Sequence, residues 1–578
     1  MQKILFIFFL YISANAFAQN NDKPFIRLQQ PLKETNAVKA SKQFISGATC
    51  KSCTLTINDQ PVKVYSTGGF AYQLNLPIGD TSFVLSATSP DNKTISKTLT
   101  YSYSLPRPAD TVKTFTISST ATFPEGNLLL QRGDKIEFKI KALSGCTAKA
   151  GDAVLYELPT TQTNGMPGIY QGEYIVREED NFVNYKFPIS ITDKNNRSFA
   201  TKTVNTFSVM SPDSPNIAIT KGRLAHLEYG LGDDRLGGAK IGYLDSNVVL
   251  NITGKVGEHW RVRLSKTRIA YIPEGLIKFL PKGTFAPQSL TTNWNVYGDD
   301  KFDYVSVGLF AKLPYQSFQL INPSKIVVDI FGATNNTNWI KQFETLKEIK
   351  NVDYEQLEDD IYRVTIELKH QQQWGYQIYY DKNNLVIKIK HQPENLSLKN
   401  LTIAVDPGHG GTNTGTSGPT GVYEKTITLA VALKLQKTLQ AAGANVIMTR
   451  TSDQFVDNHD RILFYRDSVP DLLLSIHLDG SEDPVNVGGT ATYYRYIGFK
   501  PLSNFIYKRM LELGLKEKGN TGSFNFMLNS PTEYPNALIE TVTLTNPAEE
   551  EKILDDGFQQ QMADKIVLGV KDFLQNCK

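Results

Sequence analysis

Long apolar segments are missing from almost all of this 578-residue sequence. A membrane-spanning helix needs roughly 20 consecutive apolar residues, and no run after residue 18 approaches that length. Long basic runs are missing as well, because the 61 Lys and Arg and the 58 Asp and Glu are spread along the chain. We therefore expect no transmembrane segment in the mature chain and no nucleic acid partner.

Cysteine is scarce, with four residues at positions 50, 53, 146 and 577. Four cysteines allow three pairings, and the sequence does not decide among them. Cys50 and Cys53 have the spacing of a redox or metal-binding motif, but strand-like sequence follows them where a redox motif would open a helix. We therefore expect a structural disulfide or inert thiols.

The N-terminus has the pattern of a signal peptide. Lys3 precedes a short apolar run from Ile4 to Ile12, and Ala16-Phe17-Ala18 is a small-x-small cleavage site. No cysteine lies at this site for a lipid anchor. We expect residues 1–18 to be removed and the mature protein to be exported, either periplasmic or associated with the cell wall.

At roughly 100–200 residues per domain, the length predicts three to five domains. Residues 30–105 show short alternating runs broken by turn residues, such as Thr54–Ile57 followed by Asn58-Asp59. This pattern resembles the immunoglobulin-like modules of exported bacterial proteins. A proline-rich segment follows, and residues 106–212 are expected to form a second β-sandwich-like module.

Two further β units are expected. Residues 216–283 contain a strand, a turn, a strand with Trp260 and a short Tyr-Ile-Pro strand, and they resemble a bacterial SH3-like barrel. In residues 287–393, the run Lys325–Gly332 resembles the core of the AMIN module, a cell-wall-targeting β domain.

Strand-like and helical runs alternate from about residue 398 onward. Leu401–Val405 and Leu472–Ile476 read as strands, whereas Glu424–Ala442 and His459–Ser468 read as helices. Such alternation predicts a C-terminal α/β domain over residues 398–576, with a central, mostly parallel sheet flanked by helices. The fold class is therefore multidomain, with all-β modules before an α/β catalytic domain.

Three side chains in this last region could hold a metal ion. His409 follows the first strand in a glycine-rich turn, Glu424 opens the long helix, and His477 ends the apolar run LLLSIH. Ligands of open α/β sheets bind at the carboxyl ends of strands, so these residues can converge. A His/Glu/His set suits a catalytic zinc, which keeps one position for water.

A catalytic carboxylate would complete such a site. Glu540 follows the apolar run Ala537-Leu538-Ile539 and does not belong to the ligand set. We expect it to take a proton from water and pass it to the leaving nitrogen.

Residues 399–575 resemble the zinc-dependent N-acetylmuramoyl-L-alanine amidases of the amidase 3 type. The motifs that carry the resemblance are VDPGHGG at 405–411, GxxEK ending in Glu424-Lys425, SIH ending in His477, and Glu540 followed by LTNP. The resemblance implies one zinc ion held by His409, Glu424 and His477, with Glu540 as the catalytic residue. It also implies hydrolysis of the amide between the muramic acid lactyl group and the L-alanine of the peptidoglycan stem peptide.

Five further residues are candidates for supporting a ligand or contacting substrate. Many members of the family also carry an arginine in the element before the catalytic glutamate, but residues 526–530 contain none, which leaves substrate preference open. The five candidates are Asp406, Arg450, Arg461, Asp479 and Asn546.

Two other functions stay open at this point: an inactive wall-binding scaffold, and a zinc peptidase that cuts within the stem. Some relatives have a helix inserted between the second histidine and the catalytic glutamate that blocks the zinc. Residues 478–539 are too few for such an insertion, since Phe499–Leu515 already reads as a helix of the basic fold. Peptidoglycan is the expected partner. The β modules could in addition bind an activator protein of cell division or of the envelope.

Overall fold

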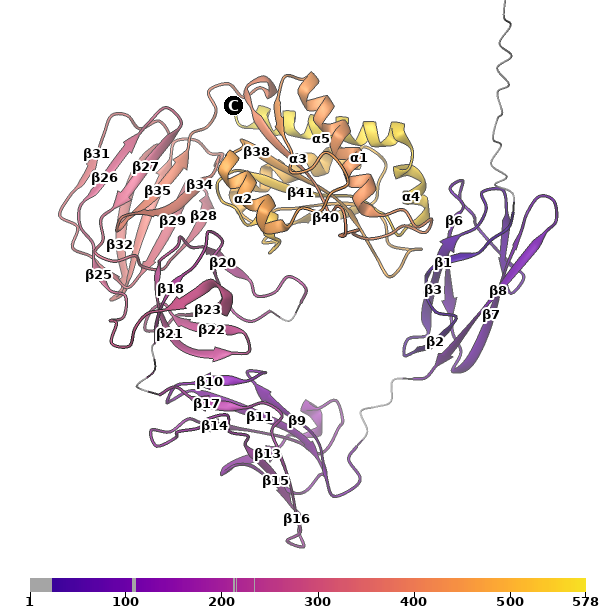
Figure 1. The fold of residues 1–578 in the computed structure, drawn as a ribbon, viewed down its shortest axis with the longest axis horizontal. Helices are drawn as coiled ribbons and strands as arrows, with labels where there is room; N and C mark the ends of the chain where they lie inside the picture. The colour runs from indigo at the N-terminus through magenta and orange to yellow at the C-terminus, as the bar shows by residue number, and fades with distance from the viewer. Residues whose placement is uncertain (1–22, 106–110, 212–213, 215, 233) are drawn as a thin grey trace, which may run out of the picture.

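The computed structural model describes residues 23–105, 111–211, 214, 216–232 and 234–578. The predicted signal peptide lies outside these residues. The N-terminal part is built of strands and the C-terminal part is an α/β domain, which confirms the predicted order of the two classes (Figure 1). Within the described part of the chain, no helix is both long and apolar enough to cross a membrane.

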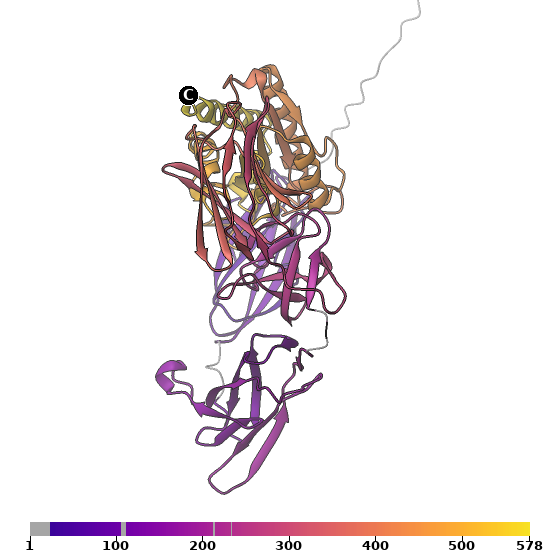
Figure 2. The same cartoon turned by 90° about the vertical axis from the view of Figure 1, so that its left-hand side faces the viewer.

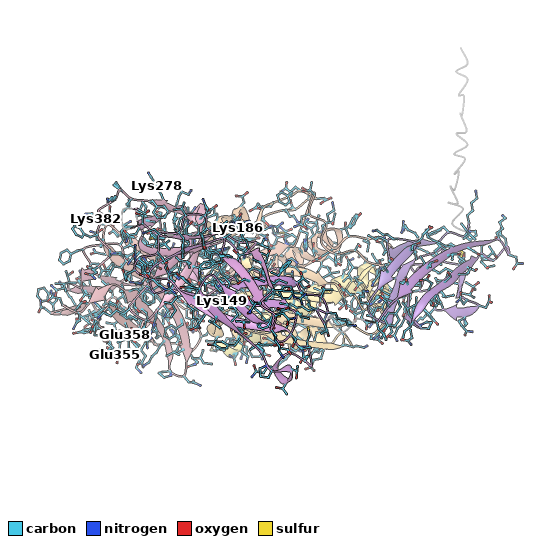
Figure 3. The ribbon with its side chains drawn as sticks, turned by 90° about the horizontal axis from the view of Figure 1, so that it is seen from below. Lys149, Lys186, Lys278, Glu355, Glu358 and Lys382 are labelled. Atoms are coloured by element: carbon cyan, nitrogen blue, oxygen red, sulfur yellow. A yellow bond between two sulfur atoms is a disulfide. The ribbon has the colours of Figure 1, made fainter. Side chains whose placement is uncertain are left out.

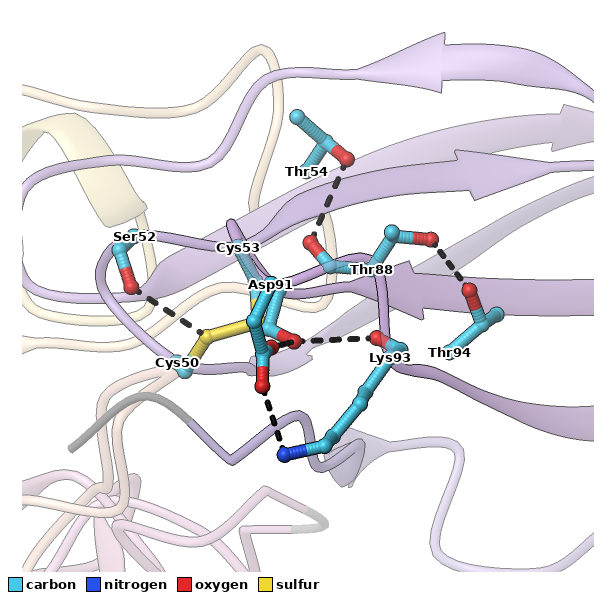
Figure 4. The surroundings of a disulfide bond; sticks show 9 residues. Cys50, Ser52, Cys53, Thr54, Thr88, Asp91, Lys93 and Thr94 are labelled. Carbon is cyan, nitrogen blue, oxygen red and sulfur yellow. Dashed lines mark hydrogen bonds and ion pairs between the residues drawn. A yellow bond between two sulfur atoms is a disulfide. The ribbon is translucent and has the colours of Figure 1, made fainter. Parts of the chain in front are cut away.

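The first β module, defined here by β1 to β8, has two sheets around one apolar core. Its predicted hairpin is present, and Asn58 and Asp59 both have positive φ, as a two-residue hairpin turn requires. Cys50 and Cys53 form a disulfide, drawn in Figure 4 with the nearby Asp91–Lys93 ion pair. The sheets are β1(Arg27–Gln30)-β3(Lys42–Ala48)-β6(Gly69–Asn75) and β2(Thr35–Val38)-β8(Thr94–Tyr103)-β7(Gly79–Thr88)-β4(Thr54–Ile57)-β5(Gln60–Val62).

The second β module contains a seven-stranded sheet. Two further strands of this module, β10(Leu128–Leu130) and β17(Phe207–Val209), belong instead to the sheet of the next module. β10 pairs antiparallel with β21(Val249–Val256), and β17 pairs with β10. Hydrogen bonding therefore continues across the boundary expected near residue 212. The sheet runs β16(Ser198–Lys202)-β15(Pro188–Thr192)-β12(Thr147–Ala150)-β13(Ala153–Glu157)-β14(Ile169–Ile175)-β11(Lys135–Ala142)-β9(Ile117–Phe123).

The third β module, β18 to β24, and the fourth, β25 to β35, share one apolar core that runs from Ala218 to Ile389. Charged side chains of both signs lie on the outer faces of the β modules: of the residues labelled in Figure 3, Lys149 and Lys186 belong to the second module, and Lys278, Glu355, Glu358 and Lys382 belong to the third and fourth. The third module contains β18(Ile217–Thr220), β19(His226–Glu228), β20(Lys240–Tyr243), β21, β22(His259–Arg263), β23(Ile269–Pro273) and β24(Ile277–Phe279). The fourth contains β25(Ser289–Leu290), β26(Trp294–Gly298), β27(Phe302–Val307), β28(Tyr315–Ile321), β29(Ser324–Phe331), β30(Ala333–Thr334), β31(Ile340–Gln342), β32(Ile349–Glu358), β33(Ile361–Leu368), β34(Tyr376–Asp381) and β35(Asn384–Lys390).

The α/β domain has a six-stranded sheet that is parallel except where β39 meets β41. The apolar stripe of the first helix, which includes Val431 and Leu435, is buried in the core of this domain. The strand order is β37(Asn445–Ile447)-β36(Thr402–Pro407)-β38(Leu472–Asp479)-β41(Asn536–Thr543)-β39(Thr490–Tyr493)-β40(Glu517–Thr521). The helices are α1(Glu424–Ala441), α2(Asn458–Ser468), α3(Lys500–Leu511), α4(Pro547–Ile553) and α5(Asp556–Asn576).

The β modules contact this domain at separate places. Lys390 of the fourth module pairs with Asp471 at 2.7 Å, and the side chain of Gln319 accepts a hydrogen bond from the backbone of Gly498. The first module lies beside α4 (Figure 1), where the backbone of Ser66 donates to Glu551 at 2.7 Å. In the view of Figure 2 this module lies at the back. The α/β domain is thus held between N-terminal modules that are distant in sequence.

Glu550 of α4 gives the stability of this region a pH dependence. Its carboxylate accepts hydrogen bonds from Thr420, but burial raises its pKa to about 7. The unfolded chain releases this proton near the ordinary pKa of 4.5, so the folded state loses stability as pH rises from about 4.5 to 7. We expect Glu550→Gln to stabilise the protein by about 2 kcal/mol at pH 8 and by little at pH 4.

Thermal unfolding of wild type and variant between pH 4 and 8 measures this difference. Glu551→Gln is the matched control, because the pKa of that neighbouring carboxyl is lowered, mainly by its hydrogen bond with Ser66. A Glu550→Gln effect that does not change with pH would contradict the assignment.

Candidate active site

Two histidines and a glutamate from three different elements converge on one point. The Nε2 atom of His409 lies 3.0 Å from Oε1 of Glu424, and Nδ1 of His477 lies 3.1 Å from the same oxygen. Their candidate ligand atoms all lie within 4.8 Å of one another, and among the described residues no other group of this kind occurs. The structure therefore brings together the three residues that the sequence predicted as metal ligands.

The turn that carries His409 is held in an unusual backbone conformation. His409 has a φ of 61°, in the left-handed region that residues with a side chain rarely adopt. A Cβ atom on Gly408 would lie 2.4 Å from the ring of His477, so only glycine allows the two elements to approach this closely. Local strain of this kind persists only where surrounding contacts enforce it.

Two buried arginines supply those contacts. Arg450 donates to the carbonyl oxygen of Gly408 at 2.7 Å, and Arg461 donates to that of His409 at 2.6 Å. Arg461 also pairs with Asp406 at 3.0 Å, and both side chains are almost fully buried. These three candidates thus hold the backbone of the histidine turn through internal hydrogen bonds.

Glu424 is fixed from both sides at the start of α1. Its Oε2 accepts a hydrogen bond from the backbone of Thr416 at 2.9 Å, and its Oε1 accepts one from Leu478 at 3.0 Å. Burial alone would raise the pKa of Glu424, but the hydrogen bonds with His409 and His477 outweigh burial and lower it strongly. The carboxyl is therefore ionised, as a metal ligand must be.

Glu540 lies on β41 directly opposite His477 on β38. Both strands continue beyond these residues, to Thr543 and Asp479, so the two side chains stand near the strand ends and not at them. The Oε2 atom of Glu540 is buried, and no described residue hydrogen bonds to it. Burial first, and then the negative charges of Glu424 and Asp479, raise its pKa well above the ordinary value.

His409, Glu424, His477 and Glu540 line one cleft with a volume of about 430 Å³. Asp479 also lines it and forms an ion pair with Lys518. Asn546 does not line it; its side chain caps the N-terminus of α4, so the structure assigns it to that helix. No residue of α3 lines the cleft.

Sequence reasoning missed several residues of the site. Asn413 hydrogen bonds to Nδ1 of His409 at 2.9 Å, which leaves Nε2 facing Glu424. Its position in the glycine-rich loop after the histidine was the only available signal. Phe524 and Phe526 line the cleft from the segment before Glu540, and Arg235 reaches it from the third β module.

The donor set fits a zinc ion. Two imidazole nitrogens and a carboxylate oxygen are the ligand types of catalytic zinc sites. The neighbouring carboxylate of Glu540, whose Oε2 is buried without a partner, has the free lone pairs that a proton acceptor beside such a metal needs. The side chains present are therefore compatible with this metal.

Comparison with known proteins gives two family matches. Residues 403–572 match the model of the N-acetylmuramoyl-L-alanine amidase family, and residues 296–389 match that of the AMIN domain. Both matches fall where the sequence motifs predicted them.

Three relatives each match about a third of this chain. The "probable cell wall amidase LytH" of Staphylococcus aureus is 34% identical over 190 residues, which are 32% of this chain and 63% of LytH. The chain thus spans less than two thirds of the length of this curated relative. An N-acetylmuramoyl-L-alanine amidase structure from Clostridium difficile 630 is 32% identical over 31% of this chain and 100% of its own, with a TM-score of 0.30. The amidase AmiC2 of Nostoc punctiforme is 27% identical over 30% of this chain and 97% of its own, with a TM-score of 0.29.

Proposed function

Since residues 403–572 form a domain of the N-acetylmuramoyl-L-alanine amidase family and residues 296–389 form an AMIN domain, we propose that this protein is an exported peptidoglycan hydrolase. It cleaves the amide bond between the lactyl group of N-acetylmuramic acid and the L-alanine of the stem peptide. The observation that carries this proposal is the convergence of His409, Glu424 and His477 beside Glu540 in one cleft of that domain.

His409, Glu424 and His477 are the residues that would hold a single zinc ion. When bound, zinc supplies a Lewis acid that makes water a nucleophile near neutral pH. Asn413 orients the ring of His409 through Nδ1, and Arg450 and Arg461 hold its backbone. Such outer contacts fix a ligand's direction before the metal arrives.

Glu540 is the general base and then the general acid. Its buried Oε2 has no competing hydrogen bond among the described residues, so the oxygen is available to take a proton from the attacking water. The same carboxyl then delivers that proton to the leaving nitrogen of L-alanine. A raised pKa favours this second step, because the proton stays on the carboxyl until the amide bond breaks.

The β modules hold the enzyme at the cell wall. We assign residues 30–105 and 106–212 to sandwich-like modules, the first of them immunoglobulin-like, and residues 216–283 to an SH3-like barrel; residues 287–393 contain the AMIN domain. With the signal peptide at 1–18 and the α/β domain at 398–576, this division supports a periplasmic or wall-associated protein. An envelope or cell-division protein that binds these modules is a further partner.

Analysis of digestion products separates this function from the two alternatives. Purified peptidoglycan treated with the full chain is expected to release intact stem peptides that begin with a free L-alanine amino group. Mass spectrometry identifies these ends. Fragments cut inside the stem would instead show a peptidase, and no release by a zinc-loaded chain would show a wall-binding scaffold.

A further inference from the structure

Arg235 enters the candidate active site from another part of the molecule. It belongs to the hairpin loop between β19 and β20 of the third β module, yet its side chain lines the cleft together with His477 and Glu540. Its positive charge acts to lower the pKa of Glu540, although burial dominates and raises that pKa. The third module therefore contributes a side chain to the catalytic cleft.

The loop that carries Arg235 is fastened to the α/β domain. The side chain of Asn525 donates hydrogen bonds to the carbonyl oxygens of Leu236 at 3.3 Å and Gly238 at 2.8 Å. Its Oδ1 accepts a hydrogen bond from the backbone of Lys240 at 3.1 Å. One amide thus holds the loop from just after Arg235 to the start of β20, and it stands between the cleft-lining residues Phe524 and Phe526.

Apolar packing beside the cleft reinforces this attachment. Leu224 of the third module is buried together with Ile462 of α2 and Leu528, and Phe526 packs against this cluster. Arg223, the residue before Leu224, forms an ion pair with Asp467, which belongs to α2 like Ile462. The module is therefore docked at the rim of the cleft through both apolar and polar contacts.

Arg235 is the cationic side chain of the cleft whose guanidinium can bind a substrate anion. Among the described lining residues, only Arg235 and Arg461 carry a permanent positive charge. The guanidinium of Arg461 is already bound to Asp406 and to backbone carbonyls, whereas no described residue accepts a hydrogen bond from that of Arg235. The other ionisable lining residues besides the two histidines are the carboxyl groups Asp406, Glu424, Asp479 and Glu540, which in their charged form repel an anionic substrate.

We propose that Arg235 binds a carboxylate of the stem peptide, so that the third β module forms one wall of the substrate site. This inference rests on the proposed amidase function, since the stem peptide carries free carboxylates beyond its first residue. A guanidinium binds a carboxylate through two parallel hydrogen bonds, which fixes direction as well as position. Arg235 thereby makes recognition of the peptide depend on a residue outside the catalytic domain.

Binding measurements with the full chain test this inference. Glu540→Gln provides a background that holds substrate without cleaving it, and Arg235→Ala and Arg235→Lys are added to that background. The probes are a soluble muramoyl peptide with free carboxylates and its counterpart with those groups amidated. Arg263→Ala is the matched control, because Arg263 belongs to the same module, contacts Gln131 and does not line the cleft.

We expect Arg235→Ala to raise the dissociation constant of the free-carboxylate peptide about tenfold, with partial recovery in Arg235→Lys. The amidated peptide and the Arg263→Ala control should show almost no change. Equal weakening of both peptides, or no weakening of either, would overturn the inference. If wild type fails to cleave the peptide while the difference in binding persists, the proposed reaction is wrong and the carboxylate site stands.

Discussion

Replacement of His409, Glu424 or His477 by alanine is expected to remove zinc from the protein and to abolish release of stem peptides. The three ligand atoms lie within 4.8 Å of one another, so each variant leaves only two donors. Loss of an outer hydrogen-bond partner alone costs roughly 10–100-fold in metal affinity, and loss of a ligand itself must cost more than about 100-fold. The variants should therefore be both metal-free and inactive at ordinary zinc concentrations.

Metal analysis of the purified variants, together with a peptidoglycan digestion assay, checks this result. His459→Ala is the matched control, because His459 lies in the same domain, is exposed, and its side chain hydrogen bonds only with Asp457 among the described residues. It should keep both zinc and activity. If His477→Ala retained a full complement of zinc, that residue could not be a ligand.

Glu540→Gln is expected to lower kcat by about 10²–10⁴-fold while zinc stays bound, because general acid–base catalysis contributes about that much. Glutamine keeps the shape of the side chain but cannot carry the proton from water to the leaving nitrogen. The Oε2 atom of Glu540 has no partner among the described residues, so the substitution breaks no known structural hydrogen bond. The folded structure should therefore be preserved.

Steady-state kinetics, zinc content and thermal unfolding together distinguish a catalytic role from a structural one. Glu517→Gln changes an exposed carboxyl on β40, which is separated from β41 by β39, and should behave as wild type. A Glu540→Gln variant that hydrolyses peptidoglycan at the wild-type rate would exclude Glu540 as the general base. Loss of zinc or of folding would assign it a structural role.

The sequence could predict most of the candidate site because its residues belong to short local motifs. His409 follows a strand, Glu424 begins a helix, and His477 and Glu540 follow apolar runs, which predicts that they lie near the carboxyl ends of the sheet strands. The resemblance to the amidase 3 family then implied their separate roles. The structure brings the two histidines and Glu424 together. The α/β class and the mostly parallel sheet could be predicted in the same way, from alternating strand and helix patterns.

Contacts between distant segments could not be predicted from patterns of this kind. Arg235 lies in an ordinary turn-rich loop, and nothing in that loop indicates that it lines a cleft in another domain. The pairing of β10 with β21 likewise depends on packing between two modules, which overrides the boundary expected near residue 212. Asn546 is part of the LTNP motif, which made it a candidate for supporting a ligand or contacting substrate. In the structure its side chain caps the N-terminus of α4 instead.

Zinc titration of the metal-stripped wild-type protein tests the central claim most directly. Hydrolysis of the muramoyl–L-alanine amide is followed by mass spectrometry as zinc is added back to the full chain. We predict that activity is absent without metal, rises in proportion to zinc and saturates at one ion per chain. Full activity in the metal-free protein, or saturation without any cleavage of this bond, would contradict the account.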